Sequence, residues 1–149
     1  PSSSSWSSGQ SSGPTLCAAA KSPNGTVTIL TGSSCSLVAM DDNDQAWYAA
    51  GTNVSGTTGY TFSNGSITDL IHGGGDYIHA VSRTSTGFTV ASYDGSSWVS
   101  DWFGNANTGG GKIAIDDEGE MWVVRWFGMC VDEYVVRSVA RYFSRSVGR

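Results

Sequence analysis

Residues 38–47 read VAMDDNDQAW, and residues 113–122 read IAIDDEGEMW. When the two stretches are aligned at an offset of 75, four of the ten positions are identical and most others are conservative. Each stretch joins an apolar segment to an acidic turn and then to a tryptophan, which is typical of two antiparallel strands linked by a tight turn. We therefore predict an all-β chain built on an internal repeat of antiparallel hairpins.

A weaker middle copy is predicted at residues 79–88, HAVSRTSTGF, where the alanine and the aromatic keep their places but the acidic turn is lost. The spacings between the aligned aromatics are then 41 and 34 residues. A small residue suits a crowded inner strand, and an aromatic fills the space toward a neighbouring sheet. We expect six residues to form the repeat core, namely Ala39, Trp47, Ala80, Phe88, Ala114 and Trp122.

Another hairpin is predicted at residues 89–99, TVASYDGSSWV, which has alternating segments on both sides of an Asp94-Gly95 turn. Residues 93–98 of this hairpin and residues 113–122 resemble blades of β-propeller proteins, particularly the tectonin-type and fungal fucose-lectin-type sugar binders. The resemblance covers roughly residues 26–126. It implies small antiparallel sheets repeated around an axis, and a sugar-binding function.

The number of repeats is smaller than such a ring requires. At most three units are visible, whereas propellers usually close with about four to eight blades. Closure would need several chains, and the alternative is an open or sandwich-like stack of sheets. We therefore expect a propeller-like or sandwich-like fold, and a homo-oligomer in which several chains complete a ring.

The chain divides into three parts by composition. Residues 1–15 are rich in serine and glycine and are interpreted as a flexible lead, residues 16–126 as the β-repeat domain, and residues 127–149 as a cationic C-terminal segment. In the last part, apolar residues recur at helical spacing, and arginines follow one another every four residues. These are Val131, Tyr134, Val135, Val139, Tyr142 and Phe143, with Arg137, Arg141, Arg145 and Arg149. The pattern predicts a short amphipathic helix, either packed on the sheets, frayed, or lying on a membrane surface.

Charge limits the choice of partners. Residues 1–124 carry three basic and eleven acidic groups, a net −8, while residues 125–149 carry a net +3. An acidic body argues against nucleic acid as the main partner. No apolar run approaches the roughly 20 residues that a transmembrane helix needs, and the stretch from Pro1 has no apolar core of a signal peptide, so we expect that such a peptide was removed or never present.

Secretion or an extracellular surface is the predicted location. Three glycosylation sequons begin at Asn24, Asn53 and Asn64, in turn-like sequence. Cys17 and Cys35 flank the strand-like run 26–30 and are the expected disulfide pair, which leaves Cys130 without an assigned role.

Several short motifs match catalytic or metal-binding patterns, but they lack the sequence context or spacing that such sites need. Residues 9–13 match a nucleophile elbow and residues 72–75 an oxyanion loop, but the first lies in a serine tract without a flanking strand. His72 and His79, with Asp76, do not have standard metal-ligand spacing. The acidic turns at 41–44 and 116–120 do not fit a calcium loop and are interpreted as solvated hairpin tips. We expect no enzyme activity, no metal and no cofactor.

Aromatic residues beside carboxylates are the candidate ligand-binding groups. Aromatic faces stack on the C–H faces of sugar rings, and neighbouring Asp or Asn side chains accept hydroxyl hydrogen bonds. The candidate residues are Trp98, Trp102, Tyr93, Asp94 and Asp101. The leading hypothesis is a secreted lectin-like protein whose partner is a glycan, and the alternative is a self-assembling subunit of a fibre, filament or surface layer.

Overall fold

The computed structural model describes residues 16–31, 36–104, 109–116, 119, 121–127 and 130–135. Every regular element in this part of the chain is a β-strand in an antiparallel sheet, so the prediction of an all-β protein is confirmed. The first strand begins at Leu16, where the composition of the chain changes.

Four sheets follow one another along the chain, each a simple meander. The first sheet has two strands, β1 (Leu16–Lys21) and β2 (Val27–Thr31). The second has four, β3 (Leu37–Met40), β4 (Ala46–Ala50), β5 (Asn53–Ser55) and β6 (Tyr60–Thr61). The third also has four, β7 (Ser66–His72), β8 (Tyr77–Arg83), β9 (Gly87–Asp94) and β10 (Trp98–Gly104). The fourth has three, β11 (Gly109–Ile115), β12 (Met121–Phe127) and β13 (Cys130–Val135).

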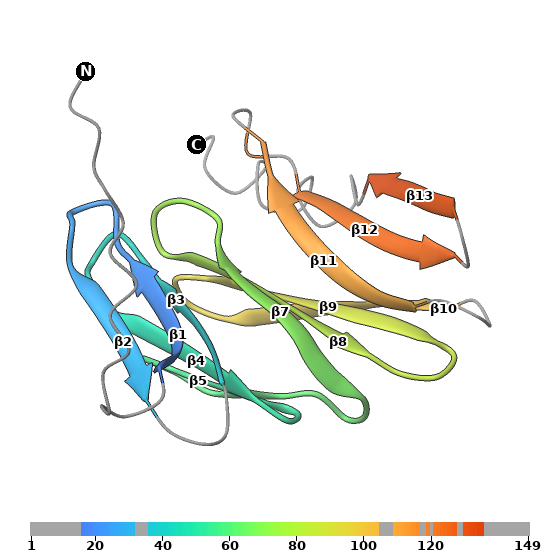
Figure 1. Ribbon diagram of the computed structural model, residues 1–149, viewed down its shortest axis with the longest axis horizontal. Coiled ribbons are helices and arrows are strands. Elements are labelled where there is room, and N and C mark those ends of the chain that lie inside the picture. The colour runs from blue at the N-terminus through green and yellow to red at the C-terminus, as the bar shows by residue number, and fades with distance from the viewer. Residues whose placement is uncertain are drawn as a thin grey trace.

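The sheets are stacked side by side through their first strands. β1 contacts β3, β3 contacts β7, and β7 contacts β11, so the chain order of the sheets is also their order in space (Figure 1). Within the described residues, the four sheets close neither a barrel nor a propeller.

The same hairpin register opens all four sheets. In the second sheet Ala39 faces Trp47, and in the fourth Ala114 faces Trp122, at the offset of 75 that the sequence repeat predicts. The first sheet has Ala20 facing Thr28 at the matching place, and the third has Ile71 facing His79. Each pair lies two residues before the start of a five-residue turn, so the structural repeat occurs four times.

The turn of the second sheet shows how the repeat is held. One oxygen of the buried Asp41 carboxylate accepts the backbone N–H groups of Asn43 and Gln45, at 3.0 and 2.9 Å. The other oxygen accepts the indole N–H of Trp47 at 2.9 Å. In the fourth sheet the indole of Trp122 donates in the same way to Asp116, at 2.7 Å. The aspartate and tryptophan of the sequence repeat are therefore hydrogen-bonded partners.

The fourth turn residue has a left-handed backbone in three of the four hairpins. Its φ is +96° at Gly25, +61° at Asp44 and +76° at Gly119. In each case its N–H donates to the carbonyl of the first turn residue. Asp tolerates this backbone region better than most residues, and Gly adopts it freely.

The predicted position of the middle copy, residues 79–88, is wrong. Ala80 pairs with Ala91, and Phe88 pairs with Arg83, so residues 79–88 do not share the register of the other two copies. Ala80 and Phe88 are both buried, but they pack into separate clusters on opposite sides of the third sheet. The copy that matches in register is residues 70–79, where a glycine-rich turn hides the similarity.

The core consists of two layers between sheets. The layer between the second and third sheets includes Trp47, Ile78, Ala80 and Tyr93. The layer between the third and fourth sheets is formed by Val81, Phe88, Val90, Ile113, Met121 and Val123. Ala39 and Trp47 are buried as predicted, whereas Ala114 is exposed and Trp122 is half-buried. The expectation that Ala114 is a core residue is therefore wrong, because no described sheet covers its face.

The C-terminal helix is not supported. Residues 130–135 form strand β13, which pairs with β12 from Trp122 to Phe127, and residues 136–149 with their arginines lie outside the described part of the chain. β-branched Val131 and Val135 suit a strand as well as a helix, and β12 offers an edge of unpaired backbone groups that β13 satisfies. The boundary predicted at residue 127 therefore falls inside the fourth sheet.

We expect Asp41→Ala to lower the free energy of unfolding by about 2–4 kcal/mol, because it leaves the buried indole N–H and two turn N–H groups without an acceptor. Asp116→Ala is the matched control, and it should cost about 1 kcal/mol or less because water can reach the half-buried Trp122. Urea unfolding of both variants measures the difference. Equal losses would contradict the role assigned to the buried carboxylate.

Candidate ligand-binding site

An aromatic seam joins the second and third sheets. Trp47 lies with its ring centroid 5.0 Å from Tyr93 and 6.0 Å from Trp98. Tyr60 lies 5.1 Å from Trp98 and packs edge-on against Phe62 at 4.9 Å. Trp47, Phe62 and Tyr93 are buried, while Tyr60 and Trp98 are half-buried at the rim of the seam.

Two of the five predicted ligand residues belong to this seam. Tyr93 and Trp98 are cross-strand neighbours with centroids 5.4 Å apart, and the Tyr93 hydroxyl donates to the Gly95 carbonyl at 2.8 Å. The indole nitrogen of Trp98 is buried without a hydrogen-bond partner among the described residues. A ligand cannot reach this nitrogen unless the ring moves, so Trp98 and Tyr93 are mainly packing residues.

Asp94 is occupied by its own turn. Its carboxylate accepts the backbone N–H groups of Ser96 and Ser97, at 2.9 and 2.8 Å, and the Ser96 hydroxyl at 2.8 Å. These bonds, that of the Ser97 backbone above all, hold the pKa of Asp94 below its usual value. The predicted Asp-Gly hairpin is present, with Gly95 at a φ of +88°, and Asp94 serves to cap it.

Trp102 is placed differently from the other aromatics. It lies on the edge strand β10, and 60% of its surface is exposed, the largest fraction among the exposed large apolar side chains in the described residues. Side chains alternate between the faces of a strand, so Trp98, Ser100 and Trp102 share one face, and Asp101 lies on the other with Phe103. The structure therefore does not bring Asp101 beside Trp102.

A shallow polar hollow of about 640 Å³ lies near the same end of the third sheet. Side chains with hydroxyl, amide and guanidinium groups contribute to its lining, which is formed by Asn64, Gly65, Ser66, Thr68, Arg83, Thr84, Ser85 and Thr86. A second hollow of about 510 Å³ lies along the first strands of the first three sheets and includes Ala20, Ala39 and Ile71 in its lining. Sequence reasoning did not find either hollow, because each combines residues from segments distant in the chain.

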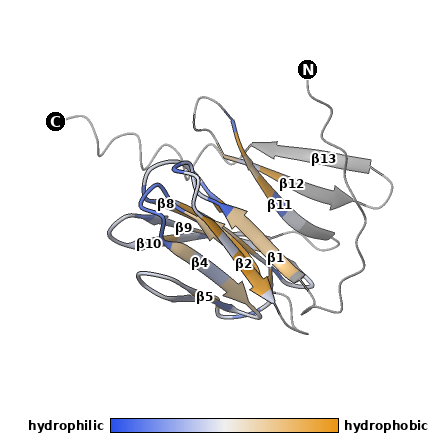
Figure 2. Ribbon diagram, turned by 60° about the vertical axis from the view of Figure 1, so that its left-hand side comes forward, coloured by the Kyte–Doolittle hydropathy of each residue, from blue (hydrophilic) through white to orange (hydrophobic). Residues whose placement is uncertain are grey.

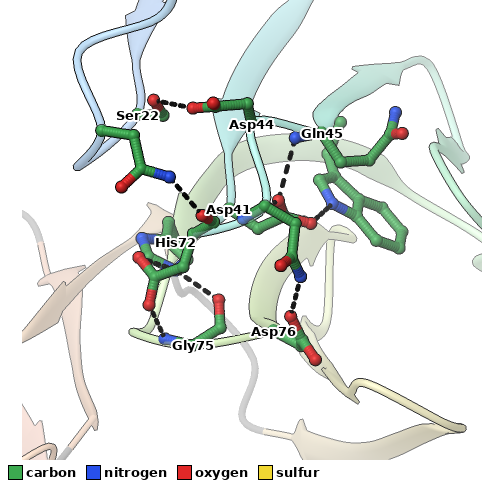
Figure 3. A network of polar contacts seen from close by, with 11 residues as sticks. Ser22, Asp41, Asp44, Gln45, His72, Gly75 and Asp76 are labelled. Carbon is green, nitrogen blue, oxygen red and sulfur yellow. Dashed lines mark hydrogen bonds and ion pairs between the residues drawn. The ribbon is translucent and has the colours of Figure 1, made fainter.

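The hairpin turns meet at one end of the molecule in a polar network (Figure 3). The Ser22 hydroxyl donates to Asp44, and the Asn24 amide donates to the Asp42 carbonyl at 2.6 Å. Asp42 in turn accepts the Gly75 N–H at 2.6 Å and lies 3.6 Å from the His72 ring nitrogen. Three successive turns are thus tied to one another.

The carboxylates of this network are used within the protein. The Asn43 amide donates to Asp76, so Asp76 joins the third turn to the second. Within the described residues there is no group of three or more His, Cys, Asp or Glu side chains that could hold a metal ion. Of residues 72–75, which match an oxyanion loop in sequence, His72 ends strand β7 and the three glycines lie in the turn between β7 and β8.

A second histidine is buried beneath that turn. The Nδ1 atom of His79 lies 2.8 Å from the Ser92 hydroxyl, and both residues are buried. Burial, and then the proximity of His72, lower the pKa of His79 from 6.5 to about 4. Gly73 is necessary above it, because a Cβ there would lie 2.3 Å from the His79 ring. A serine–histidine pair enclosed in this way is structural.

The cysteine and sequon predictions are only partly within the described residues. Cys17 is disulfide-bonded, while Cys35 lies outside the described part of the chain, so their pairing stays a prediction. Asn24, Asn53 and Asn64 are all exposed, although the Asn24 amide nitrogen already donates to Asp42. The described residues contain no helix long and apolar enough to cross a membrane.

Searches with this chain found no matching family model, no similar curated protein and no similar solved structure.

Gly56 should be intolerant of a side chain, because a Cβ there would lie 2.3 Å from the buried Trp47 ring. We expect Gly56→Ala to lower the free energy of unfolding by about 1–3 kcal/mol through overpacking of the seam. Gly59→Ala is the matched control, since its Cβ would meet only the Val54 carbonyl at 3.6 Å, an ordinary contact. Thermal unfolding of both variants tests this, and a destabilised Gly59→Ala with an unaffected Gly56→Ala would contradict it.

Stability should fall as the solution is acidified from pH 6.5 toward pH 4, because the unfolded chain binds a proton at His79 that the folded protein excludes. Above about pH 7 this residue contributes no pH dependence, since it is neutral in both states. The full loss is about 3 kcal/mol. His79→Asn keeps a polar atom near Ser92 and should flatten this part of the stability profile, measured by urea unfolding at several pH values. An unchanged slope in the variant would refute the assignment.

Proposed function

We propose that this protein is a secreted, lectin-like carbohydrate-binding protein that stacks a sugar ring on Trp102. The observation that carries the proposal is the 60% exposure of this indole on an edge strand, in a protein that uses Trp47 and Trp98 for packing. A tryptophan left in water has a cost that a stacking ligand removes. The apolar C–H face of a sugar is a chemically suitable ligand.

The surroundings of Trp102 support this choice of ligand. Ser100 is exposed on the same face of β10, and Thr89 faces Trp102 across the strand pair. Hydroxyl groups beside an aromatic platform can exchange hydrogen bonds with sugar hydroxyls, without the charged groups that a phosphate or an ammonium ligand needs. The hydroxyl-lined hollow around Arg83 is a further polar surface near the same sheet end.

The architecture that best accounts for the four sheets is an arc of a β-propeller. Register-equivalent hairpins open every sheet, and the first strands contact one another in chain order. Both features agree with the resemblance of residues 93–98 and 113–122 to sugar-binding propeller blades. Repeated sheets can present several weak sites, which raises the overall affinity for a multivalent glycan.

A location outside the reducing cytosol is part of the proposal. The disulfide bond of Cys17 supports it, because such bonds persist mainly in oxidising compartments. The exposed sequons at Asn53 and Asn64 agree with it. We propose a binding function rather than catalysis, since His79 and Ser92, which resemble a catalytic pair, are enclosed in the core.

A second candidate function is a self-assembling structural subunit. It is favoured by the open face of the fourth sheet, where Ala114 is exposed and Trp122 is half-buried although their counterparts in the second sheet are buried. The two functions are compatible, because the open face and Trp102 lie on different sheets.

Trp102→Ala should weaken glycan binding by about tenfold, since aromatic stacking contributes roughly 0.5–1.5 kcal/mol beyond the apolar area that it buries, and about 1.4 kcal/mol is a factor of ten in affinity. The melting temperature should stay within a few degrees of the wild type because the side chain is exposed. A glycan array identifies the ligand, and titration calorimetry measures the change.

Val99→Ala is the control, since Val99 is an exposed apolar residue on the opposite face of the same strand. Trp102→Phe should retain part of the affinity by keeping an aromatic face. A wild-type protein that binds no glycan on the array, or a Trp102→Ala variant that binds as tightly as wild type, would reject the proposal.

A further inference from the structure

The two ends of the stack expose apolar residues whose register counterparts elsewhere in the described part of the chain are less exposed. The register that opens each sheet defines equivalent positions. Trp47 of the second sheet, His79 of the third and Trp122 of the fourth are equivalent, and all three point in the same direction along the stack. Trp47 and His79 are buried at 0% and 6% exposure, whereas Trp122 is only half-buried.

The difference at Trp122 has a simple structural cause. Trp47 is covered by Tyr93 and Trp98 of the following sheet. Trp122 has the same register and the same aspartate partner, but no described sheet follows it. Ala114, which faces Trp122 across the strand pair, is exposed for the same reason.

The opposite end of the stack, formed by β1 and β2, also exposes apolar side chains. In register, Val27 and Ile29 of β2 are equivalent to Ala46 and Tyr48 of β4, which are half-buried. They are also equivalent to four more deeply buried residues, Ile78 and Ala80 of β8 and Met121 and Val123 of β12. These four counterparts lie within buried layers, covered by the preceding sheet, with exposures of 0–2%. Val27 and Ile29 are each 55% exposed, and in Figure 2 the ribbons of β1 and β2 are coloured mostly as hydrophobic sequence.

The two end faces of the stack are therefore of the two different kinds that pack against each other between sheets inside the chain. Within the chain, the face that carries Trp47 packs against the face that carries Ile78 and Ala80. The end face around Ala114 and Trp122 is of the first kind, and the end face around Val27 and Ile29 is of the second kind. Within the described residues of one chain the two end faces do not meet, because the four sheets close neither a barrel nor a propeller.

We propose that a second copy of this chain docks head-to-tail, with its Val27/Ile29 face packed on the Ala114/Trp122 face of the first. The contact repeats the sheet-to-sheet packing already present inside each chain. It is a heterologous interface, which continues until the rotation closes a ring or a filament forms. Two copies supply twice the four described sheets, which is the upper end of the range of about four to eight blades in propellers.

Glutamate substitutions at the two ends test the docking. We expect the wild-type chain to be oligomeric by size-exclusion chromatography with light scattering and by native mass spectrometry. Val27→Glu and Ala114→Glu should each raise the dissociation constant by about a hundredfold, because a buried carboxylate without a partner is strongly unfavourable. Both positions are exposed in the isolated chain, so folding should be preserved, as checked by circular dichroism.

Val99→Glu is the matched control, since it makes the same change at a valine that is 42% exposed on neither end face, and it should remain oligomeric. Mixing the two end variants gives the most specific result. The intact Ala114/Trp122 face of Val27→Glu can bind the intact Val27/Ile29 face of Ala114→Glu, so a one-to-one heterodimer should form from two monomeric variants.

Three results would overturn the proposal. A wild-type chain that stays monomeric at all concentrations has no such interface. An oligomer disrupted by only one of the two end variants is not head-to-tail. End variants that fail to combine on mixing show that the two faces do not bind each other. Glycan binding through Trp102 is measured separately on the same variants, so loss of assembly and loss of sugar binding are distinguishable.

Discussion

The hydrogen bonds of the Asp41 carboxylate are the constraint on which the stacking of the sheets depends. One oxygen fixes the turn between β3 and β4, and the other holds the indole of Trp47 in a single orientation. That orientation presents the ring to Tyr93 and Trp98 of the next sheet. A local turn and a contact between sheets are thus set by the same side chain, so the internal geometry of one hairpin also determines how its sheet meets its neighbour.

The first and third sheets have different residues at the positions of Asp41 and Trp47. In the first sheet Ser22 replaces the aspartate, accepts the Thr26 N–H through its hydroxyl at 3.1 Å, and has Thr28 at the tryptophan position. In the third sheet Gly73 occupies the aspartate position. His79, which occupies the tryptophan position, hydrogen-bonds to Ser92 instead of to the turn. The tryptophan indole needs a carboxylate acceptor in the turn. His79 has its partner in Ser92, so the turn residue above it needs only to be small enough to leave room for the imidazole ring. The two positions therefore change together within one chain.

The sequence was informative where the determining interactions are local. The all-β class, the register of the two acidic copies and the Asp94-Gly95 hairpin follow from short stretches and were predicted. The copies at 19–28 and 70–79 were missed, although Ala20 and Asn24 keep the spacing of Ala39 and Asn43. The segment 130–135 was assigned to a helix because residues 131 and 135 suit both periods, and the strand is decided by the unpaired edge of β12. Trp98 and Trp102 lie on one face, and only Trp47 and Tyr60, from a distant part of the chain, distinguish the packing residue from the exposed one.

The hydrogen bonds between successive turns stabilise some neighbouring sheets against each other more than others. In a linear array of repeats, stability is the sum of intrinsic terms and nearest-neighbour terms. Here the neighbour term between the second and third sheets includes both the aromatic seam and the bonds of Asp42 to the third turn. The two-stranded first sheet, like the fourth, has one described neighbouring sheet, and it contributes no residue to either buried layer. Unfolding should therefore begin by fraying at the β1–β2 end and reach the Trp47 layer last. The central pair of sheets would act as the nucleus to which the outer sheets are added.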